Sequence, residues 1–228
     1  MSAQELTPGV TTLVGMFDSP YVRRVAVSLE QLEVPFENRP WSVGRDQELL
    51  RTINPLGRVP VLVLATGETL IESSMILDYL DEQAGPERRL LPAAGAPRRL
   101  VQDWLALITG TLDKGIQIAY DRIFKPAEKM HAPWIERCYA QTYGGLRELD
   151  RRCAERGDAA WLCGDAISQA DVSLACFITY LRDSVQVDLD ATPALRARVA
   201  RLEALPLFAK YYLPFDPPKP TAAPGKPA

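Results

Sequence analysis

The order in which strand-like and helix-like segments follow one another constrains the fold of this chain more than any other feature. The run 11–16 is rich in β-forming residues, and from Pro20 onward the apolar residues recur at the spacing of a helix that buries one face. Ser19 precedes that helix at the position of an N-cap. The segments that follow are predicted strands at 34–41, 59–64 and 69–71 and predicted helices at 44–52 and 73–85.

This alternation of strands and helices predicts one small mixed sheet. A strand followed by a helix and then by a parallel strand makes a right-handed crossover. The last two predicted strands are separated only by the turn "ATGE", so they form an antiparallel hairpin. We therefore expect a four-stranded sheet with helices on its faces.

The second half of the chain carries no convincing strand signal. A segment rich in proline and glycine, 86–99, is typical of a linker. The fold class is therefore α/β followed by all-α, with domains at 10–86 and 98–212, and the proline-rich residues 213–228 are expected to be disordered. Helical periodicity predicts the helices of the second domain at 98–122, 133–156, 168–183 and 192–205.

Composition argues against several classes of function. The chain has 228 residues and a net charge of −3, which gives no reason to expect nucleic acid or anionic lipid as a partner. No apolar run approaches the ~20 residues of a membrane span, and the first residues lack the features of a secretory signal, so we expect a cytoplasmic protein. The four cysteines contain no C-x-x-C pair and there is one histidine, so we expect buried, reduced thiols and no metal site.

Ser19 is the residue whose position most suggests chemistry. It lies between a strand and a helix, where the first N–H groups of the helix have no partner and the helix dipole is positive. An anion binds well at such a position, and a hydroxyl there can donate a hydrogen bond to it. The alternative is that Ser19 only caps the helix, which by itself explains a serine before Pro20.

Three segments, "FDSPYVRRV", "NPLGRVPVL" and "IESSMILDYL", occur in this order and are roughly evenly spaced. With them the chain resembles cytosolic glutathione transferases over residues 11 to about 212, and its "SPYVRR" run is similar to that of the plant tau class. The resemblance implies a thioredoxin-like N-terminal domain, an all-helical C-terminal domain and glutathione as co-substrate. It also implies a serine-type enzyme, in which Ser19 donates to the glutathione sulfur and favours the nucleophilic thiolate.

The resemblance assigns further residues to glutathione. It implies a cis bond between Val59 and Pro60, with the backbone of Val59 pairing with the peptide as an added strand would. Glu72 would balance the ammonium group of the γ-glutamyl end, and Ser73 would hold its carboxylate at a helix start. Ordinary turn and capping roles explain each of these motifs when it is taken alone. The candidates for the glycine carboxylate are Arg45 and Arg58, where tau-class proteins have lysine.

An electrophile pocket between the two domains follows from the same resemblance. Ordinary core packing is the alternative explanation for its candidate residues. These candidates are Phe17, Tyr21, Trp41, Leu107, Thr111 and Tyr120.

The leading hypothesis is a detoxification enzyme that ionises glutathione and holds it close to a small hydrophobic electrophile. One alternative is a non-catalytic binding or stress protein on the same scaffold, and another is a specialised glutathione-dependent lyase or dehalogenase. Maleylacetoacetate isomerases have a serine- and cysteine-rich run that this chain lacks, and thiol-transfer relatives of the omega kind have a cysteine in place of Ser19. The family further implies a homodimer.

Overall fold

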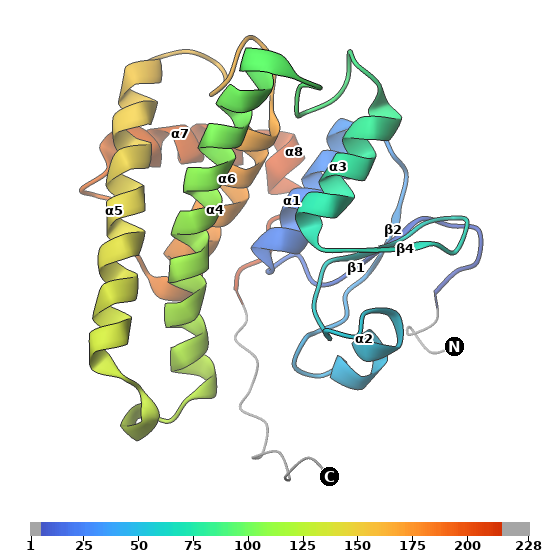
Figure 1. Ribbon diagram of the computed structural model, residues 1–228, viewed down its shortest axis with the longest axis horizontal. Coiled ribbons are helices and arrows are strands. Elements are labelled where there is room, and N and C mark those ends of the chain that lie inside the picture. Colours follow the sequence, from blue (N-terminus) through green and yellow to red (C-terminus); the bar gives the residue numbers. More distant parts are fainter. Residues whose placement is uncertain (1–5, 216–228) are drawn as a thin grey trace.

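The computed structural model describes residues 6–215, which form two parts lying side by side (Figure 1). The elements of the N-terminal part are β1 (Thr12–Val14), α1 (Pro20–Gln31), β2 (Glu37–Arg39), α2 (Gln47–Ile53), β3 (Val61–Val63), β4 (Thr69–Ile71) and α3 (Ser73–Ala84). The C-terminal part consists of α4 (Gly95–Phe124), a 3₁₀ turn (Ala127–Lys129), α5 (Ala132–Arg156), α6 (Gln169–Tyr180), a π turn (Leu181–Val185), α7 (Pro193–Glu203) and α8 (Pro206–Ala209).

The strands form one sheet in the order β2-β1-β3-β4. β1 pairs in parallel with β2 and antiparallel with β3, and β4 returns antiparallel to β3. The predicted crossover and hairpin are therefore confirmed. Successive residues of β1 face opposite sides of the sheet, because Leu13 joins the core with α1 and α3 whereas Val14 packs with Leu50 of α2.

The helical part is built around α6, in which every residue is buried. α4 and α5 run side by side along one flank of it (Figure 1). A capping box begins α6, since the Asp171 carboxylate accepts from the backbone N–H of Ser168 at 3.0 Å and from its hydroxyl at 2.7 Å. The same carboxylate accepts from the N–H of Leu162 at 2.9 Å, so it also fixes the loop that precedes the helix.

Among the predicted bounds that differ from the structure, two concern the beginning and the end of the helical part. α4 begins at Gly95, inside the segment 86–99 that was expected to be a linker, because Pro97 sits in the first turn, where its missing N–H is not needed. Phe215 was expected in the disordered tail 213–228, yet its ring packs edge-on against Tyr180 with centroids 5.2 Å apart. Residues 216–228 of that predicted tail lie outside the described residues.

α1 joins the two parts, because it packs against α3 on one side and α6 on the other. Within this junction the Arg23 side chain donates to the Glu203 carboxylate at 2.6 Å and to the carbonyl of Phe208 at 3.0 Å. One apolar core runs through both parts, so the cleft between them has fixed walls. No helix within residues 6–215 is both long and apolar enough to cross a membrane.

Candidate functional site

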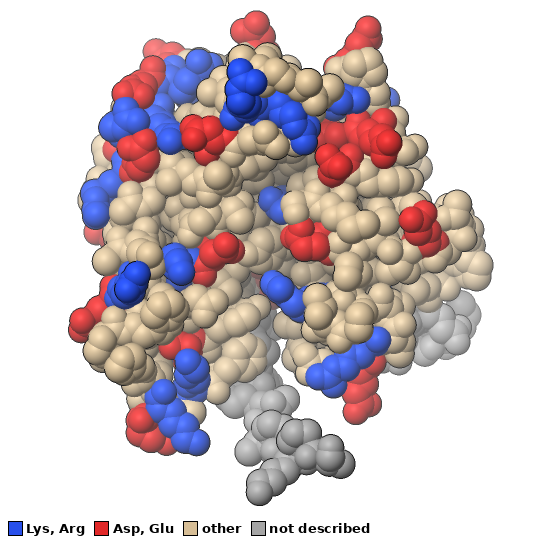
Figure 2. Space-filling view, in the orientation of Figure 1, with Lys and Arg blue, Asp and Glu red and all other residues tan. Residues whose placement is uncertain are grey.

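The cleft between the sheet and α4 contains two adjoining cavities. The first cavity has a volume of about 990 Å³ and extends over the start of α3, and the second has a volume of about 100 Å³ and lies beside the start of α1. Tyr21, Arg58 and Val59 line both cavities. Acidic and basic side chains both surround the hollow between the two parts (Figure 2).

The turn between β1 and α1 brings Ser19 to the second cavity. Gly15 in this turn has a φ of +131°, and a Cβ there would lie 2.5 Å from Val22 and 3.0 Å from Val59, so only glycine lets these segments approach so closely. Ser19 is the N-cap of α1, and its Oγ accepts a long hydrogen bond of 3.5 Å from the N–H of Val22. This cap uses a lone pair of the hydroxyl, which leaves its proton to donate to a ligand.

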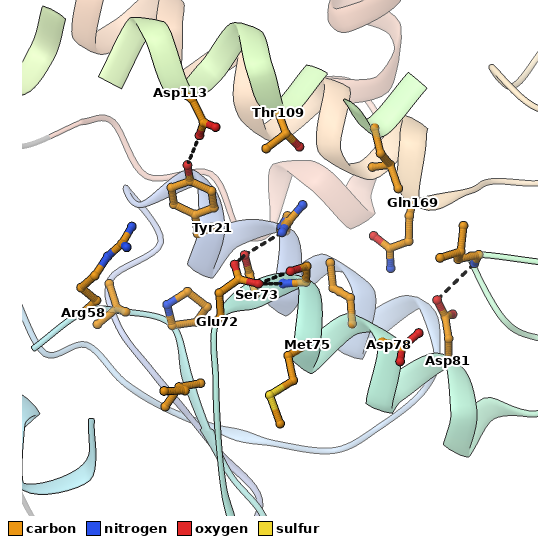
Figure 3. Close-up of a pocket in the computed structure, with 18 of the residues that line it drawn as sticks. Tyr21, Arg58, Glu72, Ser73, Met75, Asp78, Asp81, Thr109, Asp113 and Gln169 are labelled. Carbon is orange, nitrogen blue, oxygen red and sulfur yellow. Dashed lines mark hydrogen bonds between the residues drawn. The ribbon is translucent and has the colours of Figure 1, made fainter. Parts of the chain in front are cut away.

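The peptide bond between Val59 and Pro60 is cis, as the resemblance implies. Val59 lines both cavities and Pro60 lines the first. The Asn54 side chain donates to the carbonyl of Arg58 at 2.8 Å and so fixes the turn that leads into the cis bond. The exposed guanidinium of Arg58 lies beside the Tyr21 ring (Figure 3).

Glu72 and Ser73 meet at the start of α3, in the first cavity (Figure 3). Glu72 has a φ of 70°, which is uncommon for a residue with a side chain and typical of strained positions at functional sites. Its carboxylate accepts from the N–H of Ser74 at 3.0 Å and from the hydroxyl of Ser73 at 3.2 Å. Burial would raise the pKa of Glu72, but the hydroxyl and N–H of Ser74 and the charge of Arg24 together lower it, so the carboxylate is ionised.

Arg24 lies behind this pair and is 5% exposed. Its guanidinium donates to Ser73 Oγ at 2.7 Å and to Ser173 Oγ at 3.5 Å, and it stacks on the Phe177 ring at 5.0 Å. Burial lowers the pKa of Arg24, yet a guanidinium keeps its charge in proteins. The Ser73 hydroxyl is thus engaged by Glu72 and Arg24, which leaves the backbone N–H of Ser73, rather than its hydroxyl, to bind a ligand carboxylate.

The second cavity is largely aromatic and aliphatic. Three of the predicted pocket residues, Tyr21, Trp41 and Tyr120, line it, and Asp18 and Arg58 are its charged residues. Trp41 is 4% exposed, and its indole Nε1 has no hydrogen-bond partner among the described residues. The apolar residues that sequence reasoning missed here are Met16, Val43, Ile116, Ile123, Phe124, Tyr180 and Phe215.

The two predicted arginines differ in position. Arg58 lines both cavities, whereas Arg45 lines neither. The Arg45 guanidinium approaches the sulfur of Met16 at 3.9 Å, and Met16 does line the second cavity. Arg45 therefore lies at the rim of the site.

Three predicted pocket residues line neither of these two cavities. Phe17 points away from both cavities and packs edge-on against Tyr211, with centroids 5.1 Å apart. Leu107 and Thr111 lie on the other face of α4, because the Thr111 hydroxyl bonds to the carbonyl of Leu107 at 2.8 Å and its side chain packs where a Cβ of Gly145 would be. The face of α4 that lines the cavities carries Gln102, Ala106, Thr109, Asp113, Ile116 and Tyr120.

The polar residues of the first cavity that sequence reasoning missed include Arg24, Asp113 and Gln169. A signal existed for the first, because Tyr21, Arg24 and Ser28 recur at the spacing of one helix face. That face meets α6, where the Gln169 amide donates to Ser28 Oγ at 3.0 Å. Asp113 gave no such signal, since the lining face of α4 cannot be told from its sequence.

Neither metal nor cysteine chemistry is built into the described residues. Among residues 6–215 no group of histidine, cysteine and acidic side chains has the arrangement of a metal site. All four cysteines are free, with Cys163 half-buried and the others buried, and none lines either cavity. Burial raises the pKa of the Cys163 thiol to about 11 and that of Cys176 to about 12.

The arrangement suits an extended, peptide-like ligand. An ionised carboxylate and a helix N-terminus in the first cavity would accept an amino-acid end group. The segment at Val59 connects this place to the hydroxyl of Ser19 in the second cavity. A nucleophilic group at Ser19 would face an apolar space of the size of a small reactant.

Comparisons with known proteins agree with this architecture. The family models for the N-terminal and C-terminal domains of glutathione S-transferases match residues 13–88 and 132–213. The chain is 31% identical to a maleylacetoacetate isomerase from Pseudomonas aeruginosa over 90% of this chain and 95% of that protein. It is 29% identical to the glutathione S-transferase GstB of Escherichia coli, over 73% of this chain and 81% of that protein.

A solved structure is similar along nearly the whole length. It is a glutathione S-transferase from Methylobacterium radiotolerans in complex with glutathione sulfonate, with a TM-score of 0.79 and 27% sequence identity. The similarity covers 96% of this chain and 99% of that one.

Proposed function

Because this chain belongs to the glutathione S-transferase family, we propose that it binds glutathione in the cleft and activates its thiol at Ser19 for attack on a small hydrophobic electrophile. The observation that carries the proposal is the alignment of Glu72, Val59 and Ser19 along one cleft. Glutathione offers an ammonium, a peptide backbone and a thiol in the same order. The complex of the Methylobacterium relative with glutathione sulfonate supports this choice of ligand.

Each end of glutathione then has a partner. The ionised Glu72 balances the ammonium group, and the N–H groups at the start of α3 receive the γ-glutamyl carboxylate. The backbone of Val59 pairs with the cysteinyl residue, and Arg58 is the nearest cation for the glycine carboxylate. Ser19 donates to the sulfur, so the protein contributes positioning and thiolate stabilisation, and the electrophile reacts in the second cavity.

The charge of the second cavity favours conjugation over isomerisation. Similar proteins carry both kinds of name, and maleylacetoacetate bears two carboxylates. The second cavity offers one arginine, Arg58, together with Asp18, and its other side chains are uncharged. A dianionic substrate would lack a second cation there, so an uncharged electrophile fits better. Assaying both reactions with one preparation separates the two activities.

Replacing Ser19 tests the mechanism directly. Removing the hydroxyl in Ser19→Ala should raise the pKa of the bound thiol by about one to two units, because a donated hydrogen bond stabilises the thiolate. Turnover of 1-chloro-2,4-dinitrobenzene at neutral pH should fall by about tenfold or more, in step with the smaller thiolate fraction. The thiolate absorbance of the bound glutathione, followed against pH, gives the pKa.

Two further variants separate this role from helix capping. Ser19→Gly also lacks the hydroxyl but costs a helix only a few tenths of a kcal/mol as an N-cap, and Ser19→Thr keeps both hydroxyl and cap. The glycine variant should behave like the alanine variant, and the threonine variant should retain most activity. An unchanged thiol pKa in both hydroxyl-free variants would remove Ser19 from the mechanism.

We also propose that the enzyme is of the serine type with a tau-like N-terminal motif, and that it acts in detoxification in the cytoplasm as a homodimer. Leu56 and Met75, on the rim of the first cavity, are 65% and 52% exposed, and a second subunit would cover them. Light scattering should then give twice the chain mass of 25.3 kDa. A monomer mass would exclude the dimer without affecting the proposed chemistry.

A further inference from the structure

One side-chain hydrogen bond crosses the cleft between the two parts of the molecule. The hydroxyl of Tyr21, in α1, donates to the carboxylate of Asp113, in α4, at 3.1 Å (Figure 3). These residues lie 92 positions apart in the sequence. The bond spans the space in which a ligand would lie.

This bond lies at the boundary of the two cavities. Tyr21 lines both of them, whereas Asp113 lines only the first. One and two turns further along α4, Ile116 and Tyr120 line only the second cavity. The Tyr21–Asp113 pair therefore stands where the first cavity passes into the second.

The Tyr21 ring is held in place from two more sides. It packs edge-to-face against Phe177 of α6, with centroids 5.3 Å apart, and the Arg24 guanidinium lies 5.9 Å from its centre. Burial, and then the charge of Asp113, raise the pKa of Tyr21, so the phenol keeps its proton and remains a donor at all working pH values. The ring is thus a fixed wall whose outer edge is tied to α4.

We propose that the Tyr21–Asp113 pair is a partition that limits the size of the electrophile this enzyme accepts. The inference rests on the proposed function, in which glutathione passes beneath the pair with its γ-glutamyl end in the first cavity and its sulfur in the second. The pair stops the group attached to sulfur from extending back over the peptide. Tyr21 and Asp113 are then specificity-determining residues, and the sulfur chemistry stays with Ser19.

The two volumes explain why a partition matters. The second cavity, about 100 Å³, is roughly a tenth of the volume of the first, so a bulky substituent on sulfur extends out of it. The first cavity, about 990 Å³, is at the upper end of the roughly 300–1,000 Å³ of ligand pockets and exceeds the need of a tripeptide end. Without the partition, a bulky substituent extends from the second cavity into the adjoining part of the first.

Binding of S-substituted glutathiones of increasing size tests the proposal. Isothermal titration gives the dissociation constants of S-methylglutathione, S-(p-nitrobenzyl)glutathione and S-tritylglutathione for the wild type, Tyr21→Phe, Asp113→Ala, Tyr21→Ala and the Phe/Ala double variant. S-methylglutathione should bind all of them alike. The trityl derivative should bind Tyr21→Phe and Asp113→Ala about fivefold more tightly than it binds the wild type, and Tyr21→Ala more tightly still, since pocket shape discriminates on this scale.

The controls distinguish a partition from general loosening. Asp113→Asn keeps an oxygen that accepts from the phenol, so its preference among the three S-substituted glutathiones should match that of the wild type. Tyr211→Phe removes another tyrosine–carboxylate bond, to Glu30 at 2.8 Å, from outside both cavities and should also leave selectivity unchanged. The double variant should gain no more than either single variant, because both break one bond.

Two results would overturn the proposal in distinguishable ways. If every variant, including Tyr21→Ala, shows the wild-type preference among the three ligands, the pair sets no size limit although the proposed function stands. If the wild type binds neither glutathione nor S-methylglutathione, the proposed function fails and the partition fails with it.

Discussion

At the scale of single residues, the buried side chain of Arg24 supports the polar groups that line the first cavity. It is buried, it bonds to Ser73 at 2.7 Å, and its charge helps to keep Glu72 ionised. Replacing it with methionine should weaken glutathione binding by about tenfold or more, the size of a lost hydrogen bond to a charged group of roughly 1.5 kcal/mol. Turnover at saturating glutathione should change much less.

The pH dependence of binding provides the specific test for Arg24. Without its charge the pKa of Glu72 rises, so the Arg24→Met variant should lose glutathione affinity at a higher pH than the wild type as the solution is acidified. Arg24→Lys keeps the charge, so the pH at which its glutathione affinity falls should shift less. A binding profile of Arg24→Met that runs parallel to the wild type at every pH would show that Arg24 only supports the fold.

Asp81 makes folding stability depend on pH. Its carboxylate accepts from the N–H groups of Leu90 at 2.6 Å and Leu91 at 3.2 Å, and burial raises its pKa to about 6. The folded state then binds this proton more tightly than the unfolded state, so the group stabilises the fold at low pH and the contribution is lost as pH rises through about 6. The size is about 3 kcal/mol for a shift of roughly two units.

Denaturant unfolding at several pH values measures this effect. Asp81→Asn cannot titrate, so its stability relative to the wild type should be lowest near pH 4 to 5 and should improve toward pH 7.5. A difference between the two proteins that stays constant with pH would refute the assignment to Asp81.

At the scale of elements, the sequence predicted what depends on local pattern. The strands β1, β3 and β4 and the helix α1 were predicted correctly, because periodicity and cap residues act over a few positions. Of the candidate site, the residues at element ends lie at the cavities, namely Ser19, Val59 and Glu72, because motif order fixes where a strand ends and a helix begins.

The same element scale shows why the helical wall of the site was only partly predicted. α4 is apolar on more than one side, since it packs against both α5 and α6. Periodicity alone therefore does not tell which side faces the cleft, and the predicted pocket residues Leu107 and Thr111 line neither cavity. The contacts of Arg24 with Ser73 and Ser173 span 49 and 149 residues, and no local sequence pattern predicts contacts over such separations.

At the scale of the whole molecule, the two parts behave as one folding unit. Arg23 of α1 pairs with Glu203 of α7 at 2.6 Å, with the two side chains 3% and 17% exposed. Removing one partner leaves a buried charge, so Arg23→Met should destabilise the protein by about 3 kcal/mol, whereas removing both should cost less than removing Arg23 alone. Denaturant unfolding of the single and double variants measures the difference.

The number of unfolding transitions provides a second test of whether the two parts fold as one unit. Sheet and helical signals should disappear in one transition in the wild type, because the core is continuous through α1 and α6. Separate transitions in the wild type, or an Arg23→Met variant within about 0.5 kcal/mol of it, would contradict this coupling.

The placement of the cysteines has a consequence for the lifetime of the catalyst. Burial raises the pKa of the thiols of Cys153, Cys163 and Cys176, and no cysteine lines a cavity where electrophiles gather. Under the proposed function, the protein's own thiols are therefore poor targets for the electrophiles that it would bind. Among the described residues no protein thiol lines either cavity, so the thiol that is positioned to react there is the one that the ligand brings.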